Sequence, residues 1–296
     1  MRFEPMGSEI EGILVVDKAT GMSSHDVVGR VRRVAGLRRV GHAGTLDPLA
    51  TGVLLVCLGR ATRLVEYLVG QPKTYVARVR LGQTTDSYDA DGVVVDERPL
   101  TFTPTDLDNA LAQFRGDIEQ YPPMFSAVKR QGQPLYKLAR QGIEVERPLR
   151  PVTIHELTLL HCELPFIDLQ IRCSSGTYIR TLAHDLGEVL GCGGHIVALR
   201  RTAVGSFAIE TAVSLADLTT DNLPTHLLAT ETAVLHLPPL ILPNAEAKRL
   251  AQGQRLVCQP DQPQAPLVRV YAEDDTFIGV AQQQDDIWQP HKILHS

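Results

Sequence analysis

Short apolar runs, separated by polar and glycine-rich segments, recur along the whole chain. A continuous run of four to eight apolar residues predicts a buried strand, whereas strict alternation predicts a strand with one buried face. Thr74–Leu81 alternates in this way and places Tyr75 on its apolar side. We therefore expect strands at Ile13–Asp17, Val53–Leu58, Thr74–Leu81, Val152–Leu164, Phe166–Cys173 and Val197–Phe207.

Helical spacing is clearest between residues 24 and 35, where four valines fall on one face of a helix. Ser23 or Ser24 is expected to cap this helix, and Gly36 is expected to end it. Another helix is expected to begin at a cap provided by Thr105 and to reach Phe114. The pattern also predicts helices near 61–68, 177–190 and 244–252.

Two segments differ in texture from the rest of the chain. Residues 122–150 contain a Pro-Pro pair, several Gly and Gln residues, and six Lys or Arg residues, which predicts a long basic excursion. From about residue 237 short strands bounded by proline surround one helix, as in a small α+β or barrel-like domain. We therefore expect one domain at 1–235, carrying the basic insertion at about 122–150, and a second at 236–296.

The net charge of −5 at first disfavours a nucleic-acid partner, but the charges are unevenly distributed. Residues 1–80 carry a net charge of +5 and residues 125–201 one of +3, whereas 81–124 and 202–296 carry −7 and −6. A phosphate backbone responds to the local potential and not to the average over the protein. An RNA partner is therefore compatible with this sequence.

The composition favours a cytoplasmic protein that makes no use of a membrane. The longest apolar runs are far too short to span a bilayer, and residues 1–12 lack the apolar core of a signal peptide. The five cysteines are scattered and form no CxxC pair, as expected for reduced thiols.

The loop Gly41–Gly52 holds the strongest chemical signal. It reads GHAGTLDPLATG, and its three glycines permit positive φ or close approach of the backbone to a ligand. Pro48 disfavours the helical conformation at Asp47 and so fixes where that carboxylate points. Taken alone, the loop is also compatible with an ordinary tight turn whose aspartate is solvated, and no phosphate-binding glycine motif is present.

Five segments, in order over about 200 residues, resemble the motifs of the TruB family of bacterial tRNA pseudouridine-55 synthases. Two positions depart from the usual family pattern: Ala19 stands where proline is common, and Ser175 where lysine is common. The matching segments are GILVVDKATGMSSHDVV (12–28), GHAGTLDPLATG (41–52), TYVARVRLGQTTDSYDADG (74–92), YPPMFSAVKRQGQPLYKLARQGIEVERPLRPV (121–152) and SSGTYIRTLAHDLGEVLGCGGHIVALRRTAVGSF (174–207).

The resemblance implies a role for each matching residue. Asp47 corresponds to the essential carboxylate, Arg180 to the arginine that pairs with it, and Tyr75 to the aromatic residue that stacks on the target base. Tyr178 and Leu199 correspond to positions that line the uracil pocket, and His42 to the residue that fills the space vacated by the flipped base. Candidate phosphate contacts are Lys18, Arg38, Arg39, Lys129, Arg130, Lys137, Arg140, Arg200 and Arg201.

The resemblance also implies an α+β fold, with a mixed, largely antiparallel sheet flanked by helices and a small C-terminal PUA-like, β-rich domain that binds RNA. The expected substrate is the T-loop uridine of the tRNA T-arm, isomerised after base flipping. The chemistry implies no cofactor and no metal, because the isomerisation uses only atoms of the substrate. Nothing in the sequence requires a protein partner or more than a monomer.

Three alternatives are open at this stage. Cys173, His184, Cys192 and His195 lie close in sequence and invite a zinc site, although their spacing fits no common zinc motif. An RNA-binding module without catalysis would show the same basic segments. A retaining nucleoside hydrolase would need a second acid in the site, and the sequence identifies none.

Overall fold

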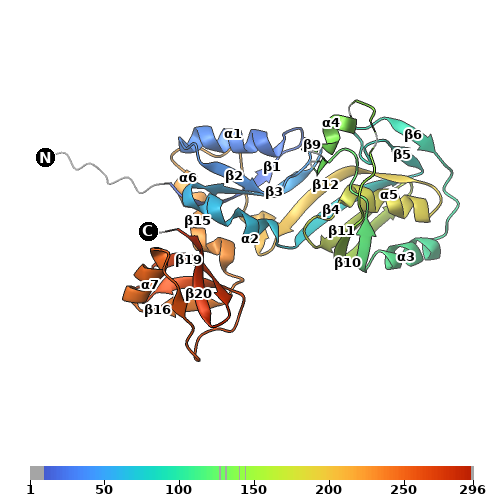
Figure 1. Ribbon diagram of the computed structural model, residues 1–296. Helices are drawn as coiled ribbons and strands as arrows, with labels where there is room; N and C mark the ends of the chain where they lie inside the picture. The colour runs from blue at the N-terminus through green and yellow to red at the C-terminus, as the bar shows by residue number, and fades with distance from the viewer. Residues whose placement is uncertain (1–9, 127, 131, 140, 144, 295–296) are drawn as a thin grey trace.

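The computed structural model describes residues 10–126, 128–130, 132–139, 141–143 and 145–294. Two sheets of different size organise these residues, as Figure 1 shows, and the smaller one lies below helix α2 at the C-terminal end. No helix in this part of the chain is long and apolar enough to cross a membrane.

The larger sheet has eleven strands among the described residues, and its main strand order is β14-β1-β3-β12-β4-β11-β10-β7. The other three strands pair at its side: β2 with β3, β13 with β12 and β15 with β1. Most neighbours are antiparallel, while β1 with β14 and β3 with β12 are parallel. The mixed, largely antiparallel sheet predicted above is therefore confirmed. Its strands are β1 Gly12–Lys18, β2 Val40–Ala43, β3 Thr51–Leu58, β4 Lys73–Leu81, β7 Gly116–Gln120, β10 Arg150–Glu163, β11 Phe166–Cys173, β12 Gly194–Val204, β13 Phe207–Ala208, β14 Val213–Ser214 and β15 Leu227–Leu228.

Helices α1, α3 and α5 share one hydrophobic core with one face of this sheet. On β1, Leu14 and Val16 belong to that core, whereas Ile13 and Val15 point to the opposite face, as the period-two geometry of a strand requires. The helices are α1 Ser24–Ala35, α2 Val65–Val69, α3 Pro104–Gln113, α4 Leu135–Ala139, α5 Ile179–Val189, α6 Leu223–His226 and α7 Asn244–Ala251, with 3-10 turns η1 Gly59–Leu64, η2 Ile209–Thr211 and η3 Thr230–Val234.

The ends of the helices follow local capping chemistry. Ser23 caps α1 in a capping box with Asp26, and Gly36 ends the helix with φ of 62°, as predicted. Helix α3 ends at its C-cap Phe114 as predicted, but its predicted N-terminal cap was wrong, because Thr103 and not Thr105 is the N-cap. Pro104 at the first helical position and Asp106 three residues after Thr103 provide the stronger start signal.

The smaller sheet has the strand order β16-β18-β19-β20-β17 and its own hydrophobic core around the fully buried Trp288. It also packs on the larger sheet, because Val280 and Leu294 share a core cluster with Ile13 and Val15. The C-terminal β-rich unit that was predicted is therefore present. Its strands are β16 Pro239–Leu242, β17 Leu256–Val257, β18 Leu267–Ala272, β19 Phe277–Gln284 and β20 Ile287–Ile293.

Apart from Arg150, which begins β10, the described residues of the basic insertion lie outside the larger and the smaller sheet. They contain a short hairpin of β8 Lys129–Arg130 and β9 Gln133–Pro134, followed by α4, at the top of the view in Figure 1. A second hairpin, β5 Gln83–Thr85 with β6 Val94–Glu97, projects beside it after β4.

Candidate active site

The loop that carries Asp47 connects β2 to β3, and hydrogen bonds and ion pairs from other segments hold most of its residues. The first part of the predicted loop is in fact strand, since Val40–Ala43 pairs with β3. Ser24 of α1 accepts a hydrogen bond from the Leu46 amide (2.9 Å) and donates one to the Leu46 carbonyl (3.1 Å). Arg201 donates to the carbonyl oxygens of Gly44 (3.1 Å) and Thr45 (3.4 Å). The backbone immediately before Asp47 is therefore fixed from two sides.

Lys18 holds the other side of this loop. Its side chain is fully buried, and Nζ donates to the carbonyl oxygens of Met22 (2.7 Å), Ala19 (3.0 Å) and Pro48 (3.3 Å). Burial lowers the pKa of Lys18 to about 8, although the negative charge of Asp47 acts against this shift. The structure thus differs from the expectation of a phosphate contact, because all three bonds of the ammonium group go to the protein backbone.

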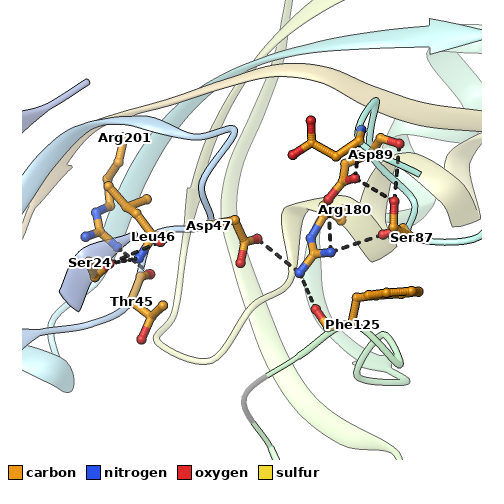
Figure 2. Close-up of polar contacts among 10 residues, drawn as sticks. Ser24, Thr45, Leu46, Asp47, Ser87, Asp89, Phe125, Arg180 and Arg201 are labelled. Carbon is orange, nitrogen blue, oxygen red and sulfur yellow. Dashed lines mark hydrogen bonds and ion pairs between the residues drawn. The ribbon is translucent and has the colours of Figure 1, made fainter. Parts of the chain in front are cut away.

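Arg180, in the first turn of α5, reaches Asp47 through a buried guanidinium. Nη2 lies 3.0 Å from Oδ2 of Asp47 and donates to the carbonyl of Phe125 at 2.7 Å. Nη1 lies 3.0 Å from Oδ2 of Asp89 and donates to the carbonyl of Ser87 at 3.1 Å. Figure 2 shows the guanidinium between the two carboxylates. The pair of Asp47 and Arg180 that the resemblance implied is thus brought together.

Asp89 was not predicted as a site residue, although it lies in the matching segment 74–92. Its side chain is only 8% exposed, and Oδ1 accepts hydrogen bonds from Oγ of Ser87 (2.5 Å) and the amide of Asp91 (3.2 Å). An acid in a segment rich in Asp, Ser and Gly is usually a solvated turn residue. The signal that could have identified Asp89 is the need of a buried arginine, here Arg180, for a compensating anion.

The electrostatic environment of Asp47 contains opposing contributions. Burial raises the pKa of Asp47 above its ordinary value; the cationic groups of Arg180 and Lys18 lower it, and the charge of Asp89 raises it further. The side chain nevertheless remains 40% exposed toward a cavity, so solvent still reaches the carboxylate and limits its desolvation.

A cavity of about 260 Å³ adjoins Asp47 and collects five of the predicted site residues, namely Asp47, Tyr75, Tyr178, Arg180 and Leu199. They come from the β2–β3 loop, β4, the residue before α5, α5 and β12. Burial raises the pKa of Tyr75 and that of Tyr178, so both phenols stay protonated at neutral pH. The cavity therefore combines one accessible carboxylate with aromatic and aliphatic walls.

His42 lies outside the set of residues that line this cavity. It occupies β2, and its ring makes an edge contact with His25 at a centroid distance of 5.5 Å. Burial lowers the pKa of His42 and favours the neutral imidazole. The structure thus places His42 before the Asp47 loop and not beside the carboxylate.

Family models cover nearly the whole described chain. Residues 32–179 match the model described as TruB family pseudouridylate synthase (N terminal domain). Residues 180–247 match a tRNA pseudouridylate synthase B C-terminal domain, and residues 238–290 match the model Pseudouridine synthase II TruB, C-terminal. The chain belongs to the TruB family of pseudouridylate synthases.

Individual relatives agree with this membership in TruB. The protein named tRNA pseudouridine synthase B from Actinobacillus pleuropneumoniae is 43% identical over 98% of this chain and 97% of its own length. Its namesake from Cupriavidus metallidurans is 45% identical over 97% of this chain and 95% of its own. A chain from the crystal structure of a Cbf5-Nop10-Gar1 complex is 26% identical, with a TM-score of 0.73 over 96% of this chain and 84% of that one.

Membership in TruB confirms the predicted enzyme class and argues against a binding module without catalysis. It also makes the zinc hypothesis unnecessary, and the geometry does not support it. Among the described residues no group of three or more His, Cys, Asp and Glu side chains could hold a metal ion. His195 Nδ1 lies 2.9 Å from the carbonyl of Gln83, and the ring of His184 stacks on Tyr88.

The basic residues proposed as phosphate contacts of this TruB chain fall into different environments. Arg38, Arg39 and Lys137 are exposed. Arg200 forms an ion pair with Asp17 at 2.8 Å, and Arg201 is only 1% exposed, so Arg201 cannot serve as a surface contact. Arg140 lies outside the described residues, as do the side chains of Lys129 and Arg130.

Proposed function

We propose that this chain isomerises the uridine at position 55, in the T-loop of tRNA, to pseudouridine, with Asp47 as the catalytic carboxylate. The relatives named tRNA pseudouridine synthase B support tRNA as the substrate. The observation that carries the mechanism is the ion pair of Asp47 and Arg180 at the wall of a small cavity. As an enzyme that acts on tRNA, the protein is proposed to work in the cytoplasm.

One carboxylate is sufficient because the reaction adds nothing from outside. The bond between C1′ of the ribose and N1 of uracil breaks, and the base leaves as a delocalised anion. The base then rotates, C5 bonds to C1′, C5 loses its proton and N1 gains one, so atoms and charge balance. Asp47 can assist either by attacking C1′ or by removing a proton from the sugar. Both roles need the ionised carboxylate.

The ionised form of Asp47 is maintained by its two cationic neighbours. Arg180 lies 3.0 Å away and is itself 6% exposed, so its charge acts on Asp47 with little screening by water. The three backbone bonds of Lys18 keep a second positive charge behind the loop. These contacts oppose the desolvation that favours the neutral acid.

The target base is expected to enter the cavity after it leaves the folded T-loop. Flipping a base out of its stack costs a few kcal/mol, which contacts in the pocket have to return. We propose that Tyr75 stacks on the uracil and that Tyr178 and Leu199 enclose it, since all three line the cavity. A stack of this kind contributes about 1–3 kcal/mol. In this proposal His42 occupies the space that the base vacates.

The hydrolase alternative requires a second carboxylic acid beside the sugar. Asp89 is a buried acid close to Asp47, but it pairs with the other arm of Arg180 and is not among the residues that line the cavity. Its oxygens already accept hydrogen bonds from Arg180 and Ser87. This arrangement supports isomerisation over hydrolysis.

We further propose a division of labour along the chain. Residues 1–235 form the catalytic domain, the basic insertion at about 122–150 closes over bound RNA, and residues 236–296 add an RNA-binding surface. The exposed Arg38 and Arg39, which follow α1, are proposed phosphate contacts.

The decisive experiment incubates the protein with unmodified tRNA and maps pseudouridine by chemical labelling. We expect product at position 55 with the wild type and none with Asp47→Asn, while tRNA binding by the variant remains. Asp96→Asn, which changes an exposed acid paired with Arg98, provides the matched control and should retain activity. Conversion by Asp47→Asn at the wild-type rate, product at another uridine, or release of free uracil would overturn the proposal.

A further inference from the structure

Tyr88 occupies an unusual position between two residues that bind Arg180. Its backbone φ of 63° lies in the left-handed region, which residues other than glycine rarely adopt. Backbone hydrogen bonds hold this turn, with the Tyr88 amide donating to Thr85 (3.2 Å) and the amide of Ile196 donating to Tyr88 (3.1 Å). A residue in this conformation persists only where its surroundings over-determine it.

The ring of Tyr88 stacks face to face on the ring of His184. The ring centroids are 3.9 Å apart and the planes differ by 10°. His184 lies on α5 one helical turn after Arg180, so the stack and the arginine are on the same side of the helix. The stack therefore ties the turn at Tyr88 directly to the helix that carries Arg180.

The residues on either side of Tyr88 are two of the four groups that hold the guanidinium. Ser87 offers its carbonyl oxygen and Asp89 its carboxylate, both to Nη1 of Arg180. The carbonyl of Phe125 binds Nη2, and Phe125 lines the same cavity of about 210 Å³ as Tyr88. Movement of the Tyr88 turn away from α5 would shift both acceptors of Nη1 together.

His184 is suited to act as a flat packing surface and not as a proton carrier. Its Nδ1 is buried without a hydrogen-bond partner among the described residues, and burial lowers the pKa of the ring. The glutamate one turn further along α5, Glu188, is paired with Arg98. The neutral ring stacks on Tyr88.

We propose that Tyr88 and His184 are positioning residues: their stack holds Ser87 and Asp89 against Arg180 and so sets the place of the guanidinium at Asp47. This inference rests on the proposed function of Asp47. The stack contributes no atom to the reaction. The stack fixes the two acceptors that bind Nη1 of Arg180. Because the guanidinium is planar and rigid, the position of Nη1 also sets that of Nη2, which contacts Asp47.

The first test compares Tyr88→Phe with Tyr88→Asn. Phenylalanine keeps the stacking ring, whereas asparagine tolerates the left-handed backbone but removes the ring. Under single-turnover conditions with unmodified tRNA, we expect Tyr88→Phe to convert uridine at close to the wild-type rate. Tyr88→Asn should be slower by roughly ten- to a hundredfold with its affinity for tRNA unchanged, because misplacement of a catalytic group by about 1 Å has this effect.

The second test approaches the stack from α5. His184→Phe replaces one stacking ring by another and should retain activity, whereas His184→Leu removes the ring but keeps an apolar side chain and should lose it. The double variant of Tyr88→Asn and His184→Leu should be no slower than the slower single variant, since both remove the same contact. Circular dichroism checks folding, and if Tyr88→Asn fails to fold, the His184 pair alone decides.

Three results would overturn the inference: a wild-type rate in Tyr88→Asn or in a folded His184→Leu variant, equal losses in the Phe and non-aromatic variants, or additive losses in the double variant. Wild-type activity on tRNA is measured first in the same assay. Its absence would refute the proposed function, whereas an active wild type with unaffected variants would refute only the role of the stack.

Discussion

The guanidinium of Arg180 and the carboxylate of Asp47 meet at 3.0 Å, yet the two side chains differ sharply in exposure. The arginine is 6% exposed and the aspartate 40%. The cation is thus anchored inside the protein, where Asp89 and two backbone carbonyls hold it, while the anion faces the cavity. A substrate that enters can reach the carboxylate without displacing its counter-charge.

Arg180→Lys should lower the rate of pseudouridine formation even though it conserves the charge. A lysine ammonium cannot reproduce the planar fork that binds Asp47 and Asp89 at the same time. We expect a loss of roughly a hundredfold or more in the single-turnover rate, similar to the loss of a fixed group that stabilises charge. Arg172→Lys, at an exposed ion pair with Glu156, is the control and should be neutral. Equal rates for Arg180→Lys and the control would contradict this role.

The pH dependence of the single-turnover rate should report the environment of Asp47. Burial raises the pKa of Asp47 above 3.8, so the active carboxylate is lost, as pH falls, at a higher pH than for an ordinary aspartate. Asp89→Asn removes a charge that raises this pKa, while its amide oxygen can still accept a bond from Arg180. The acid limb of the profile should therefore move to lower pH in Asp89→Asn. An upward shift would show that Asp89 does not act on Asp47 through its charge.

Local signals were sufficient where a few neighbouring residues determine the structure. The start of α1 at Ser23 and its end at Gly36 follow from capping alone, and the alternation in β4 follows from one buried face. The error in the cap of α3 was also local. Pro104 and the capping box of Thr103 with Asp106 determine where the helix begins, and Thr105 therefore lies inside it. These features need no knowledge of the rest of the fold.

Long-range features escaped the sequence because only tertiary packing creates them. Arg201 looks like one more basic residue beside Arg200, but the register of β12 against β3 turns its guanidinium inward. Asp89 looks like a turn residue until α5 brings Arg180 to it. Lys18 was expected at the RNA, whereas the β1–α1 connection surrounds it with carbonyl oxygens. For Arg201 and Asp89 the partners lie in other elements, and for Lys18 the long-range acceptor is Pro48 of the Asp47 loop.

Arg201→Met should destabilise the protein substantially and loosen the Asp47 loop. The buried guanidinium donates to Val53 at 2.7 Å as well as to Gly44 and Thr45, and methionine leaves these carbonyl oxygens without the donor. Hydrogen bonds from a charged group make a loss of about 3 kcal/mol in the free energy of unfolding reasonable. The exposed Arg38→Met should change it by less than about 0.5 kcal/mol. Urea unfolding of both variants measures the difference, and similar midpoints would refute the structural role of Arg201.

Gly52→Ala should be far more damaging than Gly36→Ala, although both glycines have positive φ. At Gly52, with φ of 99°, an added Cβ would lie 2.1 Å from the carbonyl oxygen of Arg201, which belongs to the paired strand. At Gly36, with φ of 62°, no atom lies within 4 Å of the added Cβ, so only the backbone conformation opposes alanine, at about 1 kcal/mol.

We expect Gly52→Ala to lose more than about 2 kcal/mol of unfolding free energy, because strain and a backbone clash add together. It should also slow pseudouridine formation, since relief of the clash requires β3 to move away from β12 at the end of the Asp47 loop. Gly36→Ala should retain the wild-type rate. Equal unfolding midpoints for the two variants, or full activity in a folded Gly52→Ala protein, would show that the β3–β12 contact does not determine where Asp47 lies.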